Sequence, residues 1–172
     1  YVDVTTLVRN AGSGTYAAGG ITALTGGTTS GLGFYGGWSL IVLYEEGSRP
    51  LRRLMVFDGN AGYVASGNPA SVTVSGLLTP PSGSFNAYMG ALVWEGDDGI
   101  TGDRFNLTGA GVLGGGSLSD AQSPNNNFWN SRISHLGSLF TGRNPAYANN
   151  FAIDLKMVDI SNVPANTGPR MA

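Results

Sequence analysis

Two neighbouring segments of the chain are almost unbroken runs of apolar residues. Residues 38–44 have the sequence WSLIVLY and residues 51–57 have the sequence LRRLMVF, with the turn-forming residues GSRP between them. Their seven-residue length and their β-branched and aromatic composition favour strands over helices. Because neither run alternates cleanly between apolar and polar positions, we expect this hairpin to be covered on both faces. The side chains that we assign to the core on this basis are Trp38, Leu40, Val42, Tyr44, Leu54, Val56 and Phe57.

Five further segments have the length and pattern of β-strands, and they are residues 71–77, 88–94, 102–107, 128–133 and 151–158. In the last segment apolar residues at 151, 153, 155 and 157 alternate with Ala152, Asp154, Lys156 and Val158, which predicts one core face and one wet face. Near the N-terminus, Leu7 and Val8 precede Gly12. That pattern fits either a strand end or a single helical turn ended by glycine.

Short strands separated by glycine turns, without a convincing amphipathic helix, are typical of β-sandwiches and jelly rolls. The chain has 28 glycines in 172 residues, more than twice the usual share of about 7%. We therefore predict an all-β fold over residues 1–163: an antiparallel, jelly-roll-like β-sandwich with glycine-rich turns. Residues 164–172 are expected to form a C-terminal tail or linker, and the start at Tyr1 suggests a piece of a longer or processed protein.

Charge and composition narrow the classes of partner. The formal net charge is −2, and the chain has a single lysine and no basic tract, so we expect no nucleic-acid partner. The longest apolar run, residues 40–44, is far shorter than the roughly 20 residues of a membrane-spanning helix, so we expect no membrane insertion. Cysteine is absent, and disulfides therefore cannot stabilise the fold.

Catalytic motifs are missing from the sequence. His135 is the only histidine, and there is no GxSxG elbow, HExxH helix or P-loop around which a reaction centre could be built. We therefore predict that the chain is not an enzyme. A hydrolase, the least favoured hypothesis, would need His135.

One acidic cluster suggests calcium. The sequence WEGDDGITGDRF contains Glu95, Asp97, Asp98 and Asp103 around glycines, and calcium takes six to eight oxygen ligands in flexible geometry. The spacing is not that of an EF-hand, and solvated turns explain the same residues. Calcium is thus an optional cofactor in this interpretation, and no other is indicated.

Aromatic and amide side chains suggest a glycan site. Sugars stack on aromatic faces and hydrogen-bond to planar amides. The residues that fit this chemistry are Trp94, Asn126, Asn127, Trp129 and Asn130. The alternative is structural: residues 128 and 129 start a strand while the asparagines form turns.

Lys156 raises a covalent alternative. A buried lysine beside an asparagine and a carboxylate could form an intramolecular isopeptide crosslink in a chain without cysteine. Asp154 lies in the same predicted strand and faces the same side, but nothing in the sequence identifies the asparagine. A surface lysine is the expectation.

Several of these motifs, taken in order, resemble a domain of large, secreted, repeat-bearing bacterial surface proteins. The motifs are YVDVTTLV, GGWSLIVLYEEGSRPLRRLMVFDGN, WEGDDGITGDRFNL, NNNFWNSRIS and TGRNPAYANNFAIDLKMVDIS. That adhesin-like family, in which the domain precedes immunoglobulin-like repeats, is regarded as adhesive or structural. The resemblance implies an extracellular, cell-surface location. Strands expected before DVTTLV and after the last segment are missing here, which predicts a sandwich without its edge strands and a sheet edge open to another chain.

Together these observations predict a non-enzymatic extracellular β-sandwich subunit, structural or adhesive. It would assemble through strand pairing into a filament or surface layer, or form part of a large surface adhesin. Its partners would be copies of itself or neighbouring domains of the same surface protein. The alternative function is a glycan-binding module, with calcium as an optional ligand.

Overall fold

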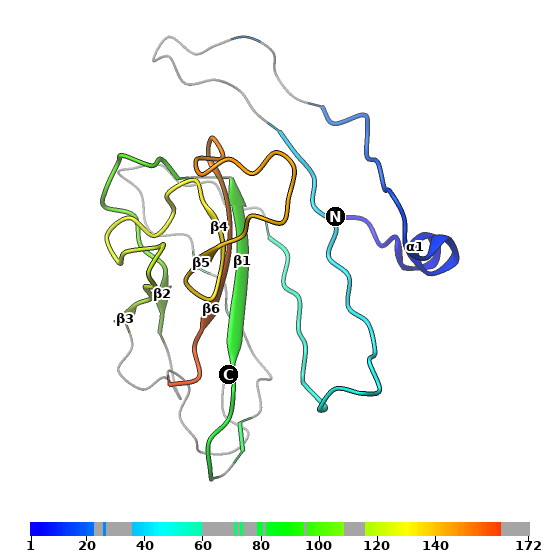
Figure 1. Ribbon diagram of the computed structural model, residues 1–172, viewed down its shortest axis with the longest axis horizontal. Coiled ribbons are helices and arrows are strands. Elements are labelled where there is room, and N and C mark those ends of the chain that lie inside the picture. Colours follow the sequence, from blue (N-terminus) through cyan, green and yellow to red (C-terminus); the bar gives the residue numbers. More distant parts are fainter. Residues whose placement is uncertain are drawn as a thin grey trace. The chain divides into compact units, whose positions relative to one another are not determined.

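The computed structural model describes residues 1–22, 26, 36–59, 71, 73, 79–80, 82–94, 96–108 and 116–162. The chain divides into two compact units, Tyr1–Asn60 and Ala61–Ala172 (Figure 1). The expected boundary at residue 163 and the expected tail lie outside the described residues. In the described ranges, no helix has the length and apolar character that crossing a membrane requires.

The first unit contains one short helix, α1 (Thr5–Ala11). The carboxylate of Asp3 accepts a hydrogen bond from the backbone N–H of Thr5 at 2.8 Å, which fixes the turn before the helix. The helix ends at Gly12, whose φ of +66° is a conformation that glycine adopts at no steric cost. Of the two structures that the N-terminal pattern allowed, the helical turn ended by glycine is therefore the correct one.

The two apolar runs of this unit are exposed, and the prediction that they form a buried hairpin is wrong. No strand is assigned in the described residues 36–59, where the chain turns through a 2.9 Å hydrogen bond from the Arg49 N–H to the Glu46 carbonyl. Leu40 is partly buried, but the other predicted core side chains are between 44% and 74% exposed: Trp38, Val42, Tyr44, Leu54, Val56 and Phe57. A β-rich sequence becomes a buried strand only where a neighbour completes its ladder, and the described residues of this unit provide none.

The second unit is built on a mixed sheet of four strands. Its order is β1 (Tyr88–Trp94), β6 (Ile153–Asp159), β4 (Ile133–His135) and β5 (Ser138–Leu139). β1 and β6 are antiparallel along their whole lengths, whereas β4 runs parallel to β6. A separate two-stranded sheet pairs β2 (Asn106–Leu107) with β3 (Gly116–Ser117). The predicted all-β, antiparallel, jelly-roll-like sandwich is therefore wrong, because the described residues form a small mixed sheet, a two-stranded ribbon and a helix.

The strand predictions have mixed outcomes. The prediction for 88–94 matches β1 at both ends. The predicted segment 151–158 becomes β6 only from Ile153, because Phe151 and Ala152 have positive φ values of 51° and 67° that leave the extended region. In the segments 102–107 and 128–133 only the last residues are in strands. Most of 71–77 lies outside the described residues.

The predicted alternation in the last strand is correct, but the face predicted to be wet is the buried one. Asp154, Lys156 and Val158 are buried, whereas Leu155 is 45% exposed. Because successive side chains point to opposite faces of a strand, a shift by one residue buries the other half of its side chains. The predicted wet face of β6 is therefore the inner face of this unit.

The apolar core of the second unit lies beside this strand. Phe128, Val158 and Ile160 are its fully buried members, and Phe105 and Trp129 pack against them with other partly buried residues. The rings of Phe128 and Trp129 meet edge to face with centroids 4.8 Å apart, and the Phe105 ring lies 5.0 Å from that of Trp129. This aromatic cluster anchors the loop that precedes β4, and with it the polar residues described next.

Candidate functional site

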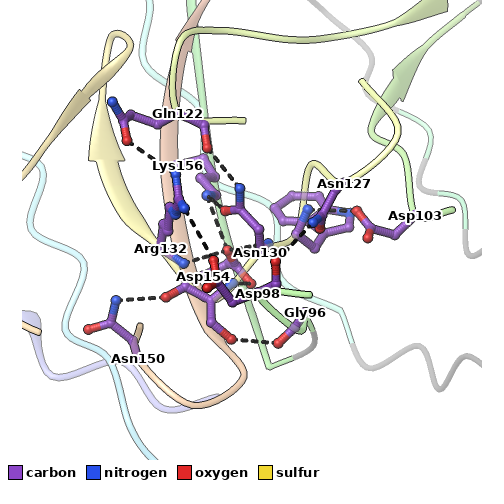
Figure 2. A network of polar contacts seen from close by, with 12 residues as sticks. Gly96, Asp98, Asp103, Gln122, Asn127, Asn130, Arg132, Asn150, Asp154 and Lys156 are labelled. Atoms are coloured by element: carbon purple, nitrogen blue, oxygen red, sulfur yellow. Dashed lines mark hydrogen bonds and ion pairs between the residues drawn. The ribbon is translucent and has the colours of Figure 1, made fainter. Parts of the chain in front are cut away.

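The buried face of β6 carries an acid and an amine. Asp154 and Lys156 lie two positions apart and therefore on the same side of the strand. They are 0% and 1% exposed, and the Lys156 Nζ lies 3.2 Å from the Asp154 Oδ1. Figure 2 shows them at the centre of a network of polar contacts. Charged side chains this deeply buried are rare and need specific partners.

The partners of Asp154 come from three consecutive backbone N–H groups. Those of Asn130 and Arg132 donate to Oδ1 at 3.1 and 3.0 Å, and that of Ser131 donates to Oδ2 at 3.1 Å. Ser131 has a φ of +58°, and this left-handed residue lets the loop curl around the carboxylate. The acid thus determines the shape of the chain just before β4.

The partner of Lys156 is the side chain of Asn130. The Nζ donates to the Asn130 Oδ1 at 2.6 Å, and the Asn130 Nδ2 donates to the backbone carbonyl of Gln122 at 2.8 Å. Asn130 is only 3% exposed. Both polar atoms of its amide are therefore engaged inside the protein, with the carbonyl end directed at the lysine.

Gly96 and Ser131 close the other side of the network. The Ser131 hydroxyl donates to the Gly96 carbonyl at 2.6 Å and accepts from the Ala152 N–H at 2.8 Å. A Cβ at position 96 would lie 2.2 Å from the Asp154 Oδ2, and the φ of Gly96 is +100°. Only glycine fits this close approach.

The outer edge of the network reaches the surface. The backbone N–H and the Nδ2 of Asn150 both donate to the Ser131 carbonyl, at 2.7 and 2.8 Å. Arg132 forms a partly exposed ion pair with Asp98, whose Oδ1 lies 3.2 Å from its Nη2. These contacts hold the ends of the loop, while the acid, the amine and the amide stay out of water.

Burial controls the protonation of the central pair. Loss of hydration raises the pKa of Asp154 above its ordinary value, although its backbone donors and Lys156 oppose that shift. The same loss lowers the pKa of Lys156, against the opposing attraction of Asp154 and, more weakly, of Asp120. Both shifts favour a neutral amine beside a neutral acid. The site therefore holds an amine in contact with both a carboxamide and a carboxyl group.

The predicted glycan-binding residues lie in different environments. Asn130 belongs to the buried network, and the buried Asn127 donates from Nδ2 to the Asp98 carbonyl at 3.3 Å. Trp129 is partly buried in the aromatic cluster, whereas Trp94 and Asn126 are exposed. The amides best suited to bind a sugar are thus occupied inside the protein, and the glycan site stays a prediction.

The predicted calcium ligands are similarly dispersed. Glu95 lies outside the described residues, Asp98 is paired with Arg132, and Asp97 is exposed. Asp103 accepts the backbone N–H of Trp129 at 2.7 Å. Within the described ranges no three acidic, histidine or cysteine side chains gather to hold a metal ion. Calcium binding, too, stays a prediction.

The sequence suggested two members of the network and missed the third. Lys156 and Asp154 stood out as a lysine and an acid on the same side of one strand, but the expectation that the lysine lies at the surface is wrong. The missing asparagine is Asn130, 26 residues earlier in the chain. A signal was present in the strand itself, because Asp154 and Lys156 share their face with the apolar Val158.

Comparisons with protein-family models, with curated proteins and with solved structures give no match.

Proposed function

We propose that this chain is a non-enzymatic structural or adhesive subunit of a cell surface, whose copies associate through the two apolar segments, residues 38–44 and 51–57. The observation that carries this proposal is the exposure of those segments. Nine of their large apolar side chains are at least 44% exposed and follow one another closely along the chain. Large exposed apolar patches mark interaction sites in soluble proteins, and these closely spaced exposed side chains are candidates for such a site.

The backbone of these segments also favours association by strand pairing. The first segment consists largely of residues that prefer strands, the second ends in Val56 and Phe57, and no strand is assigned to either in the described residues. Extended chain with unpaired N–H and C=O groups pairs readily with a strand of another molecule. An added strand would complete the ladder that the segments lack.

The charges around the turn indicate that the partner bound by the two apolar segments is a second copy of this chain. Glu45 and Glu46 directly follow the first segment, Arg49 lies in the turn, and Arg52 and Arg53 lie near the start of the second segment. In an isologous pair the same surface meets itself, so the acidic end of one segment can lie against the basic start of the other. The low net charge of −2 adds little repulsion between copies.

Two further observations support a structural role at the surface. The buried acid and amine of the second unit face inward and offer no substrate access to the groups that a reaction would need. The extracellular setting rests on the motifs that resemble secreted bacterial surface proteins. Antibody labelling of intact cells tests that setting directly.

Sedimentation velocity over a wide concentration range, with electron microscopy of the same samples, tests the assembly. We expect the unmodified chain to form dimers through the isologous contact, with filaments only if a second contact joins the dimers, and Val42→Asp to shift to the monomer. Ile100→Asp is the matched control, because it places the same charge on an exposed apolar residue outside the segments. Its assembly should be unchanged. A chain that stays monomeric at every concentration overturns self-association and leaves another protein or domain as the occupant. Equal effects of the two variants would show that the segments are not the contact.

A further inference from the structure

The buried network holds three groups in a reactive arrangement. The Lys156 Nζ lies 2.6 Å from the Asn130 Oδ1, so the amine is in contact with the amide carbonyl whose carbon is Cγ. The Asp154 Oδ1 lies 3.2 Å from the same Nζ. All three side chains are at most 3% exposed. Groups held together in an orientation suited to attack react as if their local concentration were about 10⁵ M or higher, and the hydrogen bond keeps the amine beside the carbonyl that it would attack.

We propose that Lys156 and Asn130 are joined by an intramolecular isopeptide bond between Nζ and Cγ, with Asp154 carrying the protons. The proposal is independent of how copies of the chain associate. It assigns a covalent modification site to this unit of the protein, formed by the chain's own residues without a cofactor.

The reaction balances within the network. Lys156 first passes one proton from its ammonium group to the Asp154 carboxylate. The electron pair of the neutral amine then forms the Nζ–Cγ bond, while the π electrons of the carbonyl move onto Oδ1. When those electrons return, the Cγ–Nδ2 bond breaks. Nδ2 leaves as ammonia with the proton that Asp154 held, and Asp154 takes the second proton of Nζ. The products are one amide, one neutral acid and one molecule of ammonia, with no oxidant or water consumed.

The surroundings favour each step. Burial lowers the pKa of Lys156 and raises that of Asp154, which favours the neutral amine needed for attack. The Gln122 carbonyl holds the Asn130 Nδ2 at 2.8 Å and so keeps the Oδ1 end of the amide directed at the amine. Exclusion of water also protects the new amide from hydrolysis.

The bond would connect distant parts of the chain. Asn130 lies in the loop before β4, and Lys156 lies in β6, 26 residues later. A crosslink between them would form a covalently closed ring that contains the end of that loop, β4, β5 and the start of β6. In a chain without cysteine, it would constrain the unfolded chain as a disulfide does.

The intact mass of the unmodified, folded chain tests the proposal. We expect a mass lower than that of the sequence by one molecule of ammonia. Lys156 is the only lysine, so an endoproteinase that cuts after lysine should leave the crosslinked chain uncut even after denaturation. Trypsin should release a branched peptide that joins residues 105–132 to residues 144–170. A chain of full mass that is cut after Lys156 overturns the proposal, and so does ammonia loss without the branched peptide.

Variants separate the roles of the three groups. Lys156→Met and Asn130→Ala should both have the full mass of their sequences. Asn127→Ala, a neighbouring buried asparagine that does not contact the amine, should still lose ammonia. Asp154→Asn should leave Lys156 free for amine-reactive labelling in denaturant. Complete crosslinking in Asp154→Asn would overturn the proton-carrying role. If any variant fails to fold, the mass and the digest of the unmodified chain still decide the central claim.

Discussion

The side-chain amine of Lys156 donates a 2.6 Å hydrogen bond to the side-chain carbonyl of Asn130, although 26 residues separate them along the chain. Both side chains are buried, and the carboxylate of Asp154 completes the contact. This relationship connects β6 to the loop before β4. The stability of the second unit should therefore depend on a few polar side chains as much as on its small apolar core.

Removing the lysine should be costly. Lys156→Met removes both the proposed crosslink and the polar partner of the buried Asp154, and removing one partner of a buried pair destabilises a protein by about 3–5 kcal/mol. Urea denaturation followed by tryptophan fluorescence measures the change. Arg132→Ala is the control, because its pair with Asp98 is partly exposed and should contribute less than about 1 kcal/mol. Similar losses in the two variants would contradict a special role for the buried pair.

Gly96 should tolerate no side chain. In Gly96→Ala the new Cβ would lie 2.2 Å from the Asp154 Oδ2 and would occupy a backbone conformation with φ +100°. Overpacking and backbone strain cost about 1–3 kcal/mol each, and the Ser131–Gly96 hydrogen bond would also be displaced. Thermal unfolding provides the measurement. Gly99→Ala, where nothing lies within 4 Å of the added Cβ, should change stability by less than about 0.5 kcal/mol.

The aromatic cluster should supply most of the apolar stability. Phe128 is fully buried, and Phe128→Ala should lower the free energy of unfolding by about 3–5 kcal/mol through lost burial and the cavity that remains. Phe140→Ala removes the same side chain from a position that is 48% exposed, and we expect a much smaller change. A denaturant titration of the two variants should therefore give clearly different midpoints. Equal midpoints would contradict the assignment of Phe128 to the core.

The dependence of stability on pH should distinguish a free lysine from a crosslinked one. Burial lowers the folded pKa of Lys156 below its ordinary value of 10.5. A free amine therefore contributes stability that is fully present above that value and is lost as the pH falls through the folded pKa. Asn130→Ala keeps the amine free, so its stability should rise with pH between the folded pKa of Lys156 and pH 10.5, relative to the unmodified chain. If the two chains have parallel profiles, the unmodified chain also has a free amine.

The sequence determined the local features of this protein. The segment 88–94, which contains Tyr88, Val93 and Trp94, is a strand with the predicted ends. Gly12 ends a helical turn, because its positive φ suits glycine. The alternation of residues 153–159 correctly indicates a strand with two different faces. Each of these features depends on residues close together in the chain.

Only the tertiary structure decided which face of β6 is buried, which apolar runs are covered and which asparagine meets Lys156. Hydrophobicity predicted that Asp154 and Lys156 face water, but burial of a charge depends on partners, and theirs come from residues 130–132. The segments 38–44 and 51–57 have the composition of core strands and are nevertheless exposed. A strand's burial depends on the neighbour that pairs with it, and pairing between distant segments is not encoded in the local sequence.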